Sequence, residues 1–368
     1  RRYVQTTDQT FDVVILDLPE PSTGALNRFY TVEFFVEARA ILNPDGVFSL
    51  GLPSAENYWS PELARRNGSV YWALREVFPQ VLALPGEHNF FLASDRPLPS
   101  DPAVLAERMG ERGVAPLWVT PAYIEYVLTT DRFTQVQAEL EGMVGVRRNR
   151  DRWPICYYYD LVLWLSRFYP RLARQTQELP LEVVLMLVLV GLVALARWRR
   201  LAVGLVVAAV GLAEMALEVV ILFAFQVGHG TLYGRVSLVV TAFMAGLVAG
   251  ALAGRRLTRW ARPALLGVLG GVIGLAGLLA VLPLNAPEVA YLLLALAAGG
   301  LAGMAFPLAV ALVGGEEARA AGLLYAADLA GGCLGALATA TLLVPLLGLG
   351  QTALAVALVG VVGLIAIL

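Results

Sequence analysis

The first part of the chain alternates short apolar runs with polar turns, and this pattern predicts strands and helices in turn. Phe11–Leu18 is an apolar, β-branched run that follows a polar turn, which predicts a buried parallel strand. Tyr30–Leu42 carries apolar residues at helical spacing, and Gly46–Leu52 is a second strand-like run. The strand–helix–strand order predicts a βαβ unit on a parallel sheet.

The following segment extends this predicted sheet. Glu62–Phe78 has helical periodicity. Gln80–Leu84 and Asn89–Ser94 flank the turn formers Pro85 and Gly86, which predicts an antiparallel pair of the kind often found at the end of a parallel sheet. Residues 1–150 are therefore expected to form a partial α/β domain of the Rossmann-like class.

Beyond residue 181 the pattern changes to long apolar runs separated by clusters of Arg. About seven runs approach the roughly 20 residues that a helix needs to cross a bilayer, the first being short and the last being cut by the chain end. We expect 181–368 to form an all-α, multi-pass transmembrane bundle. The runs are Leu181–Ala196, Leu201–Gln226, Val236–Ala253, Ala264–Leu282, Val289–Val313, Ala320–Leu347 and Thr352–Leu368.

Residues 151–180 are predicted to link the two parts. Within them, Tyr157–Tyr169 is aromatic and amphipathic, which suits a helix lying at the bilayer surface. A core helix of the α/β domain is the alternative. The Arg clusters after the first and third apolar runs favour a cytoplasmic location for those loops and would place the α/β domain outside. If the first run does not cross, the domain lies inside, so its side of the membrane stays open.

The composition of the chain excludes some kinds of functional site. Hydrophobic residues make up 58% of the chain and charged residues 15%, and all 27 basic residues are Arg, which excludes a Schiff-base lysine within the chain. Two Cys and two His are too few and too dispersed for a metal site. A net charge of −2 gives no reason to expect nucleic acid as a partner. The chain begins without Met and ends in an apolar run, so we expect a piece of a longer protein.

The loop after the first predicted strand is the candidate site, because ligands of open α/β sheets bind beyond the carboxyl ends of the strands. Asp17 ends that strand, and Glu20, Asn27, Arg28 and Tyr30 follow in or near the loop. The planar guanidinium of Arg28 is suited to a carboxylate or phosphate. The alternative for each is a solvated surface side chain.

Several of these segments, taken in order, resemble the second half of a spermidine synthase domain. More narrowly, they resemble the membrane-embedded spermidine-synthase-like proteins of bacteria, in which such a domain is fused to a transporter-like membrane region. The segments that carry the resemblance are Phe11–Asp17, Leu18–Thr23, Leu26–Tyr30, Tyr30–Phe35, Asn43–Val47 and Arg152–Tyr159.

The resemblance implies transfer of an aminopropyl group from decarboxylated S-adenosylmethionine, or use of S-adenosylmethionine itself, with no covalently bound cofactor. Asp17 would be the catalytic carboxylate, with Glu20, Asn27, Arg28 and Tyr30 as substrate-binding candidates. The family's glycine-rich nucleotide loop and ribose-binding acid would lie upstream of Arg1. Gly51 stands where soluble members carry Gln, and the apolar run Leu82–Leu84 replaces an amine-site Tyr, so the acceptor amine stays open.

Three acids lie inside predicted spans. Glu214 and Glu218 are one helical turn apart in the second run, and Asp328 lies in the sixth. A charge at this depth costs several kcal/mol, so each carboxyl needs a partner, a cavity or a proton. Because the chain has no Lys, the expected partner is Arg235 or a neutral side chain such as Gln226 or Tyr325. A proton relay or cation site is one interpretation, and a polar contact between helices is the other.

Three hypotheses follow. The first is a membrane-bound, spermidine-synthase-like transferase in the bacterial cytoplasmic (inner) membrane, acting on a diamine such as putrescine with a nucleoside-type donor. The second is a transporter-like protein that moves a cation or polyamine, with a degenerate, regulatory α/β domain. The third is a structural subunit. The lipid bilayer is a partner in all three, and homo-oligomerisation is left open.

Overall fold

The computed structural model describes residues 1–171, 202–230, 233–313 and 317–368. The chain divides into two compact units, Arg1–Arg174 and Gln175–Leu368, and each is described by itself. The first predicted membrane run, Leu181–Ala196, lies outside the described residues.

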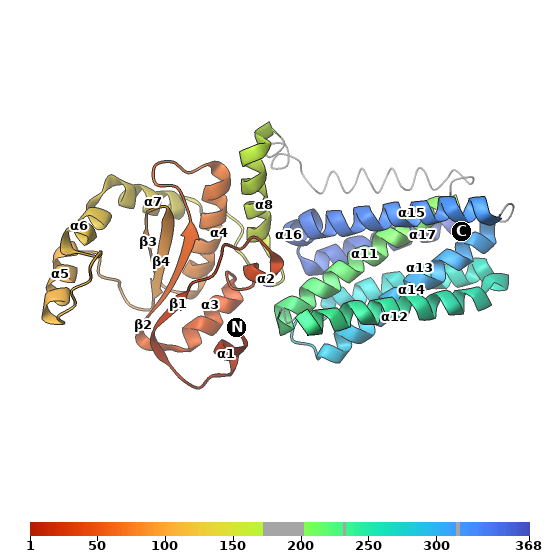
Figure 1. Cartoon of the computed structure of the whole chain (residues 1–368), viewed down its shortest axis with the longest axis horizontal. Helices are drawn as coiled ribbons and strands as arrows, with labels where there is room; N and C mark the ends of the chain where they lie inside the picture. The colour runs from red at the N-terminus through yellow and green to blue at the C-terminus, as the bar shows by residue number, and fades with distance from the viewer. Residues whose placement is uncertain (172–201, 231–232, 314–316) are drawn as a thin grey trace. The chain divides into compact units, whose positions relative to one another are not determined.

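The first unit contains a four-stranded sheet and eight helices among its described residues (Figure 1). The strands are β1 (Phe11–Leu16), β2 (Leu42–Pro53), β3 (Gln80–Leu84) and β4 (His88–Ser94). The helices are α1 (Arg2–Thr6), α2 (Gly24–Asn27), α3 (Val32–Ala40), α4 (Pro61–Val77), α5 (Pro102–Glu111), α6 (Pro121–Thr129), α7 (Asp131–Gly142) and α8 (Ile155–Phe168).

The sheet has the order β1-β2-β4-β3, with β1 and β2 parallel and the other neighbours antiparallel. This confirms the predicted βαβ unit through α3 and the predicted strand pair around Pro85 and Gly86. The predicted helix over 62–78 is confirmed as α4, which begins at the Ser60 cap, whose side chain accepts a hydrogen bond from the Leu63 amide. The small mixed sheet is consistent with a Rossmann-like domain.

One face of the sheet is covered by α3 and α4 and forms the core. Phe48 on β2 stacks on Phe78 with ring centroids 6.1 Å apart, and Phe35 on α3 packs edge-on against Phe48 at 5.6 Å. Leu50 and Phe91 are fully buried in the same cluster. Alternate residues of β2 and β4 face the other way, so the opposite face is built from Val47, Ser49, Gly51, His88, Phe90 and Leu92.

The prediction that β1 is a buried strand is wrong for one of its faces. The side chains of Val13 and Ile15 are 56% and 69% exposed. The physical reason is that α3 and α4 cover only the face of the sheet that carries Val14 and Leu16. An apolar run reports strand propensity but not how many faces of the strand are covered.

Helix α8 packs against α4. Cys156 and Leu163 belong to the buried core of the first unit, whereas Trp164 and Phe168 are exposed, with ring centroids 5.0 Å apart. The alternative prediction, that this segment is a core helix of the α/β domain, is therefore confirmed for the side of α8 that faces α4. The aromatic side of α8 is exposed, and its location at the bilayer surface stays a prediction.

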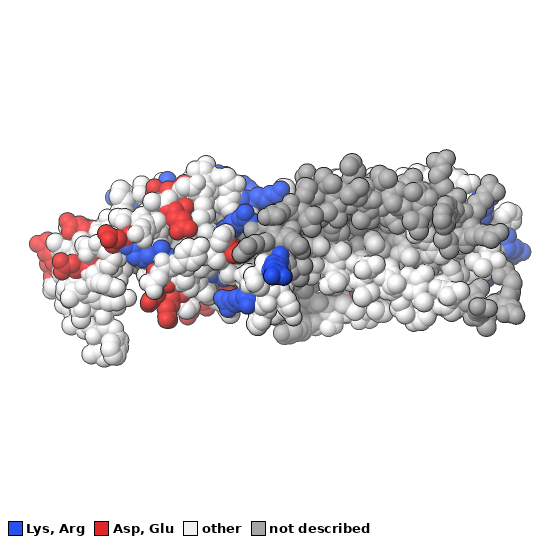
Figure 2. Space-filling model, turned by 90° about the horizontal axis from the view of Figure 1, so that it is seen from above, with Lys and Arg blue, Asp and Glu red and all other residues white. Residues whose placement is uncertain are grey.

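The second unit is helical, and six of its helices are long and apolar enough to cross a membrane. This agrees with six of the predicted runs. Figure 2 shows the acidic and basic side chains concentrated on the first unit, while the visible described surface of the helical unit is largely uncharged except at an end. The helices are α11 (Ala202–His229), α12 (Tyr233–Arg256), α13 (Ala261–Val281), α14 (Glu288–Val313), α15 (Glu317–Ala338), α16 (Val344–Leu347) and α17 (Leu349–Ile367), with a 3₁₀ turn at Thr258–Trp260 and a π-helical turn at Thr339–Leu343.

These helices pack in pairs, with α12 against α14, α11 against α15 and α13 against α17. Glycines permit the closest approaches, because a Cβ on Gly303 of α14 would overlap the Leu247 carbonyl oxygen of α12. Six long apolar helices with such contacts suggest a membrane protein.

Candidate functional site

A cleft of about 720 Å³ lies at the carboxyl ends of the parallel strands β1 and β2. We call it the acid cleft, because the Asp17 and Glu20 side chains line it. Ser49, Gly51, His88 and Phe90 line it from β2 and β4. Its volume falls in the range of sites for small molecules, and its position is the one at which ligands of α/β sheets bind.

The two carboxylates come from one short loop. Asp17 directly follows β1 and is exposed, and Glu20 is half-buried three residues further on. The loop is rich in Pro, and the Ser22 amide donates a hydrogen bond to the Glu20 carbonyl at 2.7 Å. Since Pro fixes φ, this loop holds its carboxylates with little backbone freedom. The structure thus brings together Asp17 and Glu20, the two acids that the sequence predicted for the site.

Tyr30 lies behind this loop rather than in the cleft. Its side chain is completely buried, and its hydroxyl lies 2.9 Å from the Leu18 carbonyl oxygen and 2.8 Å from that of Pro19, to which it donates. Burial, aided by the Glu20 carboxylate, raises the pKa of Tyr30 above its usual value, so the hydroxyl remains a donor. Tyr30 therefore fixes the loop between Asp17 and Glu20.

Asn27 and Arg28 are buried and, among the described residues, are not part of the cleft lining. The Asn149 side-chain amide donates to the Asn27 carbonyl at 3.4 Å, and the Arg1 guanidinium donates to the Arg28 carbonyl at 2.9 Å. The Arg28 guanidinium lies 5.4 Å from the centroid of the Phe29 ring. Burial and then the nearby Arg1 charge lower the pKa of Arg28 to about 10. The substrate-binding roles of Asn27, Arg28 and Tyr30 stay predictions.

Phe90 and His88 line the cleft from β4, and neither is among the site residues predicted from the sequence. His88 is exposed at the start of β4. Strand alternation could have identified both, because His88 and Phe90 share a face with Gly51 on the neighbouring strand. A Cβ on Gly51 would lie only 3.3 Å from the Phe90 ring, so the Phe90 ring occupies the space that a longer side chain at 51 would need.

The acids of the helical unit form a second candidate site. Glu214 and Glu218 on α11 are buried, and Asp328 on α15 is half-buried. A Cβ on Gly211 would lie 2.5 Å from the Asp328 carbonyl oxygen, so Gly211 lets the two helices meet here. Among the described residues, the Glu214 Oε1 atom has no hydrogen-bond partner.

Arg235, one of the expected partners of these acids, pairs with Glu288 instead. The expectation for Arg235 is therefore wrong. Both residues lie in the first turn of their helices, α12 and α14, where an ion pair avoids the cost of burial in an apolar layer. Tyr325 is exposed, and its ring packs edge-on against Phe306 at 6.0 Å.

The acid cleft lies largely within a segment that is similar to known proteins. A family profile described as the spermine/spermidine synthase domain matches residues 1–63. The N-terminal part of the chain is thus a spermidine synthase domain segment, with homologues among the polyamine aminopropyltransferases.

Three such relatives are bacterial. The polyamine aminopropyltransferase of Oceanobacillus iheyensis is 33% identical over 76 residues, which cover 21% of this chain and 13% of the relative. That of Leptospira interrogans is 31% identical over 106 residues, 26% of this chain and 20% of the relative. Polyamine aminopropyltransferase 1 of Streptomyces coelicolor is 36% identical over 62 residues, 16% of this chain and 12% of the relative. The chain covers at most about a fifth of the length of these relatives.

Proposed function

We propose that this chain is part of a membrane-bound aminopropyltransferase whose reaction takes place in the acid cleft. The observation that carries the proposal is the exposed Asp17 carboxylate, held beside Glu20 at the carboxyl end of a parallel strand pair within the spermidine synthase segment. The six long apolar helices would place the enzyme in a lipid bilayer, and the resemblance to bacterial proteins favours the cytoplasmic membrane.

In the proposed reaction, Asp17 orients the acceptor amine and takes up the proton that its nitrogen loses. The donor implied by the resemblance, decarboxylated S-adenosylmethionine, supplies a propyl carbon activated by a positively charged sulfur. The new C–N bond forms as the C–S bond breaks, and the electron pair of the broken bond leaves with the sulfur. The acceptor implied by the resemblance is a diamine such as putrescine, and Glu20 would attract its positive charge.

The test is product formation by the Asp17→Asn variant. Asparagine keeps the shape of the side chain but cannot accept the proton or carry the charge, so we expect a loss of about 10²- to 10⁴-fold in rate. The complete protein in lipid nanodiscs is supplied with decarboxylated S-adenosylmethionine and putrescine, and the aminopropylated product is measured by mass spectrometry.

Asp8→Asn is the matched control, because Asp8 is an exposed aspartate of the same unit and is not part of the cleft lining. It should keep the activity of the unchanged protein. Equal activities for Asp17→Asn and Asp8→Asn would exclude Asp17 from the reaction.

A second candidate function, movement of a cation or polyamine across the membrane, is favoured by the buried Glu214 of α11 and the half-buried Asp328 of the adjoining α15. A carboxyl group in an apolar layer needs a proton, a cation or a polar partner, and movement of a cation or proton would use the first two. We expect Glu214→Gln to abolish flux of radiolabelled putrescine into proteoliposomes. Unchanged flux in Glu214→Gln and Asp328→Asn would reduce the pair to a contact between α11 and α15.

A further inference from the structure

A second cavity of about 700 Å³ lies on the same face of the sheet as the acid cleft. Its floor is formed by Leu82 and Leu84 of β3 and by Leu92 of β4, and its other wall comes from α5, α6 and the segment before them. We call it the apolar cavity. Leu82 and Leu84 belong to the apolar run that stands where the resemblance expects an amine-site tyrosine.

The two cavities adjoin each other. His88 and Phe90 line both, and these residues alternate along β4 with their side chains on one face. Phe90 is 51% exposed although it is a large apolar residue. Its ring lies over Gly51, and a side chain at position 51 would push this ring away from the sheet. The absence of a side chain at Gly51 thus shapes the passage between the cavities.

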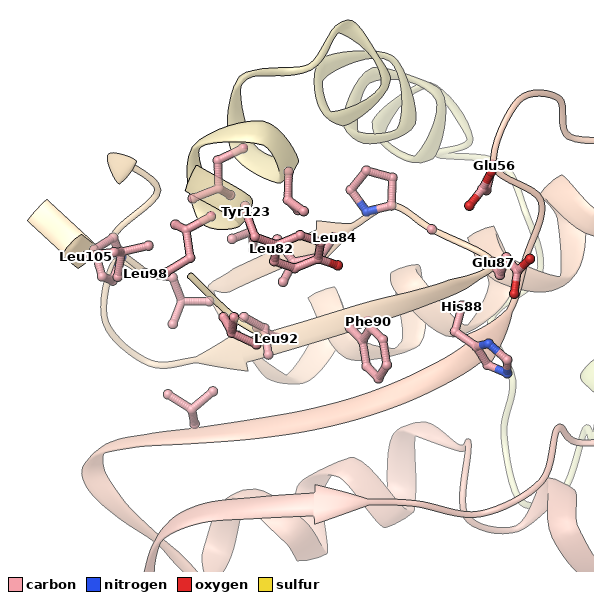
Figure 3. Close-up of a pocket in the computed structure, with 18 residues that line it drawn as sticks. Glu56, Leu82, Leu84, Glu87, His88, Phe90, Leu92, Leu98, Leu105 and Tyr123 are labelled. Atoms are coloured by element: carbon pink, nitrogen blue, oxygen red, sulfur yellow. The ribbon is translucent and has the colours of Figure 1, made fainter. Parts of the chain in front are cut away.

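The combined groove is polar at one end and apolar at the other. Figure 3 shows Glu87 and His88 at one end of the apolar cavity, Leu98 and Leu105 at the other, and Phe90 between them. The carboxylates of Asp17 and Glu20 lie beyond the polar end, in the acid cleft. Among the described residues that line the two cavities there is no Arg, so the groove offers negative charge without a neutralising side chain.

This arrangement fits one class of ligand. We propose that the acid cleft and the apolar cavity form a single groove for an amine with an apolar tail, with the nitrogen at Asp17 and Glu20 and the tail across Phe90 against Leu82 and Leu84. The inference rests on the proposed function, because it names the class of acceptor for the same site. It differs from the acceptor that the resemblance implies, since putrescine has no tail to fill the apolar cavity.

The affinity should rise with tail length. Each methylene removed from water favours binding by about fourfold. Glu56 and Glu87 line the end of the cavity near His88, whereas a second amino group at the far end, beside Leu98 and Leu105, would have to lose its water without gaining a partner there. An alkylamine should therefore bind more tightly than a diamine with the same number of carbons.

The experiment uses two photoreactive probes and the complete protein in lipid nanodiscs. One is an n-octylamine that carries a diazirine at the far end of its tail, and the other is the octanol of the same length and label. After irradiation without any donor, mass spectrometry locates the adducts. We expect the amine to label peptides of the apolar cavity about tenfold more than the alcohol, because only the amine pairs with the carboxylates.

Leu82→Gln tests the tail, and Val13→Gln is its matched control on the same sheet. Val13 is exposed and lies outside the lining of both cavities. We expect Leu82→Gln to lower labelling by the amine, and Val13→Gln to leave it unchanged. Equal labelling by the two probes, or equal labelling of the two variants, would overturn the proposed groove.

The outcomes also separate this inference from the transferase proposal. Labelling of the cavity that depends on Leu82, with no aminopropylated product from any amine, would refute the transferase and keep the groove. Product formation that depends on Asp17, with putrescine preferred over octylamine, would keep the transferase and refute the groove.

Discussion

The hydroxyl of Tyr30 provides the sharpest test of how the loop with Asp17 and Glu20 is held. Tyr30→Phe removes a single oxygen and leaves the buried ring in place. The Leu18 and Pro19 carbonyls, 2.9 and 2.8 Å from that oxygen, would then lose the same buried donor. Leaving a buried acceptor unpaired costs about 1–3 kcal/mol. The cost falls on the loop and not on the core, because the ring packing does not change.

Hydrogen exchange of the complete protein, followed by mass spectrometry, measures this cost locally. A loss of one to two kcal/mol should speed exchange of the amides in the loop at residues 18–24 by roughly 5- to 30-fold. The rate of aminopropyl transfer should fall about tenfold or more, because Asp17 would no longer be held in the position that the reaction needs.

Tyr71→Phe is the control for the same chemical change. Tyr71 is a buried tyrosine of α4 whose hydroxyl accepts a hydrogen bond from the Gln137 side chain at 3.3 Å, away from the loop. It should change neither loop exchange nor rate. If Tyr30→Phe leaves exchange of the loop unaltered, the hydroxyl does not hold the loop and the reasoning fails.

Three further predictions concern stability and accessibility. Arg66→Met should lower the free energy of unfolding by about 3 kcal/mol in a denaturant titration, because it leaves the Asp160 carboxylate, 2.8 Å from Arg66 in a largely buried ion pair, without its partner. Adding Asp160→Leu should restore most of the lost stability. Cys156 should resist iodoacetamide at pH 8 in the folded protein, because burial raises the pKa of its thiol to about 12; rapid alkylation would contradict this. Gly211→Leu should lower the thermal midpoint by separating α11 from α15; an unchanged midpoint would argue against their close contact.

Local patterns predicted the four strands, the helices α3 and α4, and the long apolar helices, but not the short helices α1, α2, α5, α6 and α7. The apolar run of β1, the helical spacing of α3 and the turn formers Pro85 and Gly86 each report a preference that the folded chain keeps. The long apolar runs carry the strongest signal, because a helix that crosses a bilayer must be apolar over its whole length. Six of the seven runs therefore correspond closely to the helices of the second unit.

Contacts distant in sequence could not be predicted in this way. Whether Tyr30 points into the cleft or behind the loop depends on where the Leu18 and Pro19 carbonyls lie, and no periodicity encodes that. The position of Arg28 likewise depends on tertiary packing, because its carbonyl accepts a hydrogen bond from Arg1, which is 27 residues away in the sequence. The exposure of Ile15 depends on which faces of β1 are covered, a property of the whole sheet.

The two groups of carboxylates lie in environments that suit different chemistry. Asp17 is exposed to water and lines the acid cleft, where its carboxyl group is accessible to a cationic amine. Glu214 is buried on α11, one turn from Gly211, where α15 approaches with Asp328. Exposure to water suits Asp17 to the proposed transfer reaction, whereas burial suits Glu214 to the alternative of cation or proton movement. A transferase needs only the first property, and a transporter needs the second.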